Sequence, residues 1–148
     1  MPFQLSTRGR YGVRLMVALA MNYGKGVSLL RDIARQEGIS EKYLGQIIIP
    51  LRTAGLVTSQ RGSRGGYLIA QPPERVTVKD VVQAIEGRIN PVPCVEDENA
   101  CDRATTCVAS GVWKKLRRDI EESLSGFTLA ELAQQAREPI VPGENYMI

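Results

Sequence analysis

The chain has 148 residues and a net charge of +3, and its 43% hydrophobic and 24% charged residues are those of an ordinary globular protein. It contains no histidine, which excludes Ser-His-Asp and Cys-His catalysis because both need an imidazole base, and nothing else in the sequence favours an enzyme. No apolar run approaches the ~20 residues that span a bilayer, and the first residues lack the pattern of a secretory signal. We therefore expect a cytoplasmic protein with no membrane partner.

Two helices are predicted at the start of the chain. Apolar residues at helical spacing predict a first helix over Thr7–Asn22, and the glycines of residues 23–26 end it. Ser28 is expected to cap a short second helix, because a serine hydroxyl can accept a hydrogen bond from a free backbone N–H at a helix start. Gly38 is expected to close that helix.

A third helix should follow after a tight turn. Ser40 opens it only two residues after Gly38, and Gly55 ends it. Two helices joined in this way, the second of them long and amphipathic, are typical of a helix-turn-helix. Pro50 falls inside the third helix, where we expect a kink; the alternative is that the regular helix ends early at this proline.

A small β-hairpin is predicted directly after the third helix. Residues 56–60 and 67–70 are β-prone, and residues 61–66 form a basic, glycine-rich turn between them. A hairpin with arginines at its tip, placed after a candidate recognition helix, is the wing of a winged helix-turn-helix. The expected fold is therefore mainly α-helical with a small β-hairpin wing.

The charge distribution favours DNA as the partner of this part of the chain. Residues 1–66 carry ten Lys and Arg against three acids, a net +7, whereas the remaining residues carry a net −4. A basic front half suits a polyanion, although a solvated basic surface is the plainer alternative. The candidate DNA-binding residues lie at the start of the third helix, at its end and on the wing: Ser40, Glu41, Lys42, Tyr43, Gln46, Arg52, Arg61, Ser63 and Arg64. The residues at the start of the helix would contact base edges in the major groove, and Arg52 would contact a phosphate. The wing arginines would enter the neighbouring minor groove.

The second half of the chain is predicted to hold a cysteine loop and further helices. Thr77 should cap a helix through Ile85, residues 88–104 should form a loop, and a long helix should start near Thr105 or Thr106. The long helix carries an apolar stripe that predicts a homodimer seam, with docking on the chain's own wing and first helix as the alternative: Val108, Val112, Leu116, Ile120 and Leu124. A capping box predicts a last helix over 129–136.

These elements divide the chain into three parts. Residues 1–73 form the winged helix-turn-helix DNA-binding domain, and residues 74–138 hold the cysteine loop and the dimerisation helices. Residues 139–148 are expected to be a flexible tail.

Three cysteines, Cys94, Cys101 and Cys107, fall within fourteen residues. Their odd number and the expected reducing compartment disfavour disulfides, and their spacing differs from the paired cysteines of structural zinc sites. We expect Cys107 to lie in the first turn of the long helix, where the helix dipole favours the thiolate. The cluster predicts metal or redox chemistry, with three unrelated free cysteines as the alternative.

Four features together resemble the iron–sulfur cluster regulator (IscR) family of bacterial winged helix-turn-helix transcription regulators. They are the opening segment 5–12, the helix-turn-helix segment 32–44, the wing segment 61–68, and the cysteine triplet with Trp113 after it. The resemblance covers nearly the whole chain. It implies a homodimeric transcription regulator, a repressor of iron–sulfur cluster biogenesis genes, whose binding to a double-stranded operator responds to an iron–sulfur cluster, usually [2Fe-2S].

The chain departs from this family at the fourth cluster ligand. Ser110 stands where the enterobacterial type has its histidine ligand, and Arg10 stands where the nitric-oxide-sensing branch has an acidic ligand. A separate difference lies on the recognition helix, where Gly45 replaces an acidic residue of the enterobacterial type. The fourth ligand is expected to be, in order of preference, a loop carboxylate, an exogenous ligand or Ser110. The loop carboxylates are Glu96, Asp97, Glu98 and Asp102.

An alternative function keeps the fold but dispenses with the cluster. In it the chain is a winged-helix regulator controlled by a partner protein or by thiol redox state, as in the cysteine-metabolism regulators that this fold also resembles.

Overall fold

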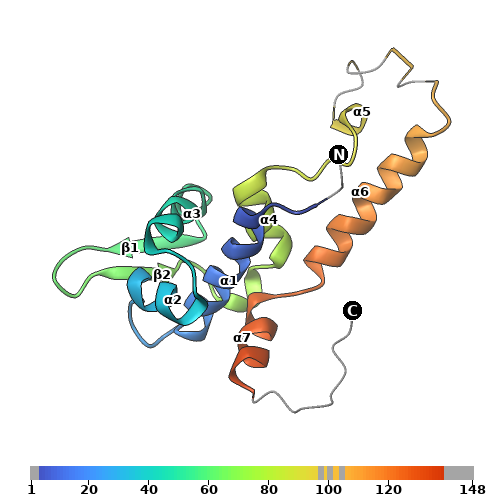
Figure 1. Ribbon diagram of the computed structural model, residues 1–148. Coiled ribbons are helices and arrows are strands. Elements are labelled where there is room, and N and C mark those ends of the chain that lie inside the picture. Colours follow the sequence, from blue (N-terminus) through green and yellow to red (C-terminus); the bar gives the residue numbers. More distant parts are fainter. Residues whose placement is uncertain (1–3, 97–98, 100–101, 104–105, 139–148) are drawn as a thin grey trace.

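The computed structural model describes residues 4–96, 99, 102–103 and 106–138, without the side chains of Cys94 and Glu96. Helices dominate this part of the chain, and one two-stranded antiparallel hairpin accompanies them (Figure 1). The elements in chain order are α1 (Thr7–Met21), α2 (Leu30–Glu37), α3 (Glu41–Thr53), β1 (Val57–Gln60), β2 (Gly66–Ile69), the 3-10 turn η1 (Pro73–Arg75), α4 (Val78–Glu86), α5 (Pro93–Glu96), α6 (Ser110–Ser125) and α7 (Leu129–Arg137). The predicted fold class, mainly α-helical with a β-hairpin wing, is confirmed.

The helix-turn-helix forms as its local sequence signals predict. The left-handed backbone of Gly38, at φ 67°, ends α2, and the Ser40 hydroxyl then accepts the Tyr43 backbone N–H at 3.0 Å to start α3. The alternative, an early end of the helix at Pro50, is wrong, because α3 continues through this proline to Thr53. The kink at Pro50 stays a prediction.

The expected cap at Ser28 is wrong, because this residue belongs to the wing. Its backbone N–H donates to the Tyr67 carbonyl at 2.9 Å, and its carbonyl accepts from the Tyr67 N–H at 2.8 Å. Leu29 takes the N-cap position of α2 without a side-chain hydrogen bond. The contact also requires a glycine at Gly66, where a Cβ would lie 2.6 Å from the Ser28 carbonyl oxygen.

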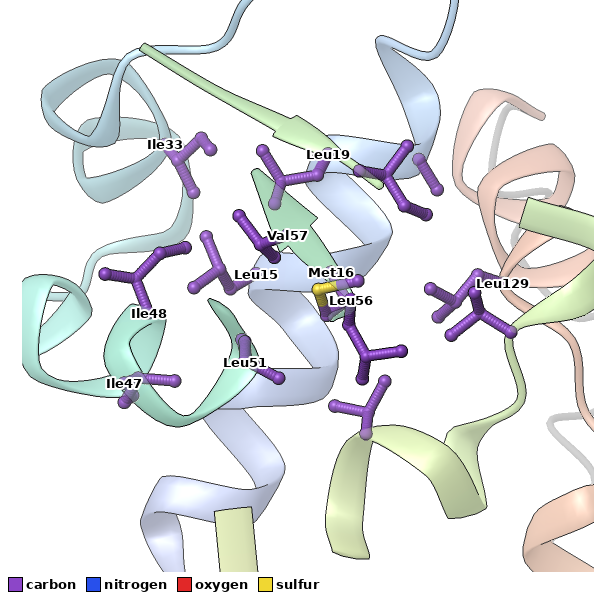
Figure 2. Packing of buried hydrophobic residues seen from close by; sticks show 14 of the residues in the cluster. Leu15, Met16, Leu19, Ile33, Ile47, Ile48, Leu51, Leu56, Val57 and Leu129 are labelled. Atoms are coloured by element: carbon purple, nitrogen blue, oxygen red, sulfur yellow. The ribbon is translucent and has the colours of Figure 1, made fainter. Parts of the chain in front are cut away.

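The hydrophobic core is built around α1. Leu15 and Leu19 point from α1 toward α3 and the wing, and Leu129 of α7 lies on the other side of the helix (Figure 2). Val81 of α4 is in the same cluster, so the core is continuous across the predicted domain boundary at residue 73. Helices α4 and α7 therefore support the DNA-binding unit directly.

The long helix α6 extends away from this core (Figure 1). None of its 16 residues is buried, and it packs against α4 and α5. Its predicted start at Thr105 or Thr106 is wrong, because it begins at Ser110 after an Ala109 N-cap. Val108 is 94% exposed and precedes the helix, so the apolar stripe starts at Val112.

Two further differences concern the segment before α6 and the tail. The short helix α5 lies inside residues 88–104, which we expected to form only a loop. A proline at its first position suits a helix start, because the missing N–H has no partner there in any helix. The tail over 139–148 lies outside the described residues. No helix among the described residues has the length and apolar character needed to cross a membrane.

Candidate nucleic-acid interface and cysteine segment

Helix α3 presents a continuous outward face. Lys42, Gln46 and Ile49 are exposed and follow one another at spacings of four and three residues, which places them on one side of the helix. The opposite side is buried in the core through Leu44, Ile47, Ile48 and Leu51. Packing against α1 and α4 therefore fixes α3 in place and leaves this face exposed.

The beginning of α3 is held by contacts with α1. The half-buried Tyr43 packs its ring edge-on against Tyr11, with the ring centroids 5.9 Å apart. The Arg14 guanidinium lies 5.3 Å from the centre of the Tyr11 ring and pairs with Glu37 at 3.0 Å. Tyr43 thus fastens the recognition helix to α1, while the neighbouring Glu41 is exposed. The contacts of Glu41 and Tyr43 with DNA stay predictions.

The remaining candidates for DNA binding are three exposed arginines and one serine, at the end of α3 and on the wing. Arg52 lies in the last turn of α3, and Arg61, Ser63 and Arg64 lie in the turn that joins β1 to β2. Among the described residues, the ion pairs involve none of these arginines and not Lys42. Their charges are therefore available for phosphate groups.

The sequence analysis missed Ile49, which is 61% exposed. We chose DNA-binding candidates only among polar side chains and assigned Ile49 no role. Spacing alone would have found it, because position 49 is three residues from Gln46 and seven from Lys42.

Two of the three cysteines lie at least partly in the described chain, at opposite ends of the cysteine segment (residues 88–109). Cys94 is in α5, whereas Cys101 lies outside the described residues. Cys107 carries an exposed free thiol and precedes α6 by three residues. The expected place of Cys107 in the first helical turn is therefore wrong, and so is the argument that the dipole of α6 activates its thiol from that position.

The candidate fourth ligands are only partly described. Asp97 and Glu98 lie outside the described residues, and so does the side chain of Glu96. Asp102 is exposed in a turn, and Ser110 opens α6, with its backbone N–H donating to the Cys107 carbonyl at 3.2 Å. No three potential metal ligands come together among the side chains that the structure describes, a set that leaves out Cys94 and Cys101.

Hydrogen bonds and ion pairs connect the cysteine segment to α6 and to the core. Arg117 of α6 donates to the Val95 carbonyl at 3.1 Å, directly beside Cys94. Glu121, one turn further along, faces Lys79 of α4 at 4.0 Å and Arg88 at 3.7 Å.

At the end of α4, Glu86 accepts the Ser6 backbone N–H at 2.8 Å and so holds the start of α1. A Cβ on Gly12 would lie 2.0 Å from the Ile85 Cδ1 atom, which shows how closely α1 and α4 pack. The cysteine segment, which follows α4 directly, is thus joined to the helix at the centre of the core.

Comparison with known proteins gives consistent matches over nearly the whole chain. The family described as "Rrf2: Iron-dependent Transcriptional regulator" matches residues 5–135. The chain is 40% identical to the HTH-type transcriptional regulator CymR of Bacillus subtilis, over 88% of this chain and 89% of the relative. It is 35% identical to the HTH-type transcriptional regulator IscR of Aliivibrio salmonicida, over 87% and 76% respectively.

Solved structures agree with these matches. The structure of T. potens IscR has a TM-score of 0.73 and 38% identity, covering 93% of this chain and 90% of that one. The structure of B. subtilis CymR, described as the global cysteine regulator, has a TM-score of 0.74 and 39% identity, covering 90% and 98% respectively.

Proposed function

Because the chain belongs to the Rrf2 family of iron-dependent transcriptional regulators, we propose that it is a homodimeric repressor of iron–sulfur cluster biogenesis genes. In this proposal Cys94, Cys101 and Cys107 hold an iron–sulfur cluster, most simply [2Fe-2S], whose presence changes operator binding. The observation that carries the proposal is the place of the cysteines in the chain. They lie between α4, which packs on α1, and α6, which extends from the core.

DNA binding rests on the outward face of α3 and on the wing. The α3 face, with Lys42 and Gln46, is free to enter a major groove, while the buried side of the helix stays in the core. The unpaired arginines of the wing then supply charge to the flanking backbone or minor groove. Each phosphate that they neutralise releases a counterion, so the affinity should fall steeply with salt.

A homodimer is supported by the exposed apolar residues of α6. Val112 and Leu116 are 57% and 39% exposed on a helix that has no buried residue. A symmetric pair of α6 helices would cover these side chains. It would also set the spacing of two recognition helices on a two-fold operator.

The chemistry of the cysteine segment fits an iron–sulfur cluster. Thiolates are the usual ligands of such clusters, and Cys107 offers an exposed free thiol. Among the candidate carboxylates for the fourth cluster ligand, Asp102 is the one whose side chain the structure describes, and it is exposed. When bound, a cluster supplies a redox-active centre whose presence depends on the supply of iron and sulfide.

The contacts of α4 and α6 provide a physical route from the cysteines to the DNA face. Arg117 joins α6 to the backbone beside Cys94, and Glu121 joins α6 to α4 through Lys79. Glu86, at the end of α4, then holds the start of α1, on which α3 packs. A ligand shifts DNA binding only by its differential affinity for two forms of the protein, and these contacts can differ between such forms.

Anaerobic reconstitution with iron and sulfide, followed by visible spectroscopy, tests the cluster. We expect a coloured wild-type protein and a colourless triple variant, Cys94→Ala, Cys101→Ala and Cys107→Ala. The matched control is Ser110→Ala, which should remain coloured, because we rank this hydroxyl last among the fourth ligands. A wild type as colourless as the triple variant, but still bound to a specific operator, would support control by a partner protein or by thiol redox state instead.

A further inference from the structure

The outward face of α3 has an apolar centre. Ile49 is 61% exposed, and it lies on the side opposite the buried residues Leu44, Ile47 and Leu51. The side chain therefore contributes little to the core of the protein. An isoleucine exposed on the outward face of the recognition helix is free to contact a ligand.

Gly45 leaves open space beside Ile49. It lies one helical turn before Ile49 on the same face, and a Cβ built on it would meet nothing within 4 Å. Packing thus does not require a glycine here, although glycine inside a helix destabilises it relative to alanine. Its effect is to leave no side chain at this position beside Ile49, with Lys42 and Gln46 as neighbours on the outward face.

The Ile49 side chain is also held ready for contact. A β-branched residue in a helix has one strongly preferred χ1 rotamer, so little side-chain freedom is lost when it binds. The Thr53 hydroxyl donates to the Ile49 carbonyl at 3.1 Å and so is engaged with the backbone of its own helix. The Thr53 hydroxyl, one helical turn after Ile49, is therefore not free to compete with the isoleucine for a base edge.

We propose that Ile49 determines operator specificity by packing against the C5-methyl group of a thymine in the major groove. Among the four bases, thymine alone presents a methyl group in the major groove, and apolar side chains recognise it by contact. Gly45 lets α3 approach the base closely, and Gln46 can bond a neighbouring adenine. The inference rests on the proposed binding of DNA, but it needs no cluster.

Replacing thymine by deoxyuridine tests the contact directly, because it removes only the methyl group. An operator is first selected from random duplex DNA with the wild-type protein, and each thymine is then replaced in turn. Binding is measured by fluorescence anisotropy at fixed salt. At one thymine in each half-site we expect deoxyuridine to weaken wild-type binding about fourfold, the value of one buried carbon, ~0.8 kcal/mol.

The variants separate this contact from general loss of affinity. Ile49→Ala, whose side chain is too short to reach the thymine methyl, should bind thymine and deoxyuridine operators equally. Ile49→Ser, which carries no methyl group, is the second variant and should give the same result. Lys42→Ala, on the same face, should bind more weakly while keeping the fourfold ratio.

Specific binding with no methyl effect at any position, or an effect that persists in both Ile49 variants, would overturn the inference alone. A wild type that selects no sequence would overturn the proposed function with it.

Discussion

The proposed dimer can be tested by making the exposed side of α6 polar. In the double variant Val112→Ser and Leu116→Ser, two side chains that are 57% and 39% exposed in the single chain lose their apolar groups. Burying a whole valine or leucine is worth about 2 kcal/mol, so their exposed parts together are worth about 2 kcal/mol in each protomer when an interface covers them. In a two-fold symmetric dimer both protomers carry the substitutions, so the loss of free energy at the interface doubles. The dimer should therefore lose about 4 kcal/mol, which is roughly a thousandfold in Kd.

Sedimentation equilibrium over a wide concentration range measures this Kd. The matched control is Arg118→Ser, an exposed polar position on the same helix, which should leave the Kd unchanged. Because no residue of α6 is buried, circular dichroism should show the same helix content for both variants. A double variant that dimerises as tightly as the wild type would refute the assignment of Val112 and Leu116 to the interface.

Three further predictions concern the wing, the core and the outward face of α3. Arg64→Ala should weaken operator binding and reduce the slope of log K against log salt by about 1, since one phosphate contact is lost. As a control, Lys115→Ala should keep the wild-type slope, because the Lys115 ammonium pairs with Asp119 at 2.7 Å. An unchanged slope for Arg64→Ala would contradict the wing assignment. Gly12→Ala should lower the free energy of unfolding by about 1–2 kcal/mol, because its Cβ would lie 2.0 Å from the Ile85 Cδ1 atom and this clash outweighs the gain in helix propensity. Gly45→Ala, which has open space, should instead stabilise by about 0.5–1 kcal/mol. Urea unfolding measures both, and equal stabilities would argue against the close packing of α1 on α4.

The elements set by neighbouring residues were predictable from the sequence. Gly38 and Ser40 mark the turn of the helix-turn-helix, because the end of one helix and the cap of the next depend on local backbone geometry. Thr77 caps α4 for the same reason, and its N–H bonds the Asp80 carboxylate in return. These short-range signals were enough to give the winged fold.

Features that depend on distant residues were not predictable. Ser28 looks like a helix cap, yet its backbone pairs with Tyr67, 39 residues away, and this pairing has no local signal. Val108 shares the four-residue spacing of the apolar stripe but precedes α6, so the spacing placed Cys107 inside a helix that starts after it. Ile49 was missed for a different reason: only polar side chains were considered for DNA contact, although its spacing from Lys42 and Gln46 places it on the same face.

The central claim is that binding of an iron–sulfur cluster to the three cysteines is coupled to operator binding. One comparison of affinities tests it. The operator Kd is measured without oxygen for wild-type protein with and without its iron and sulfide, and for the variant Cys94→Ser, Cys101→Ser and Cys107→Ser under both conditions. We predict that the two wild-type values differ by about fivefold or more, the usual lower range of allosteric coupling, while the variant gives a single value. Equal wild-type affinities at full iron and sulfide content would contradict the claim.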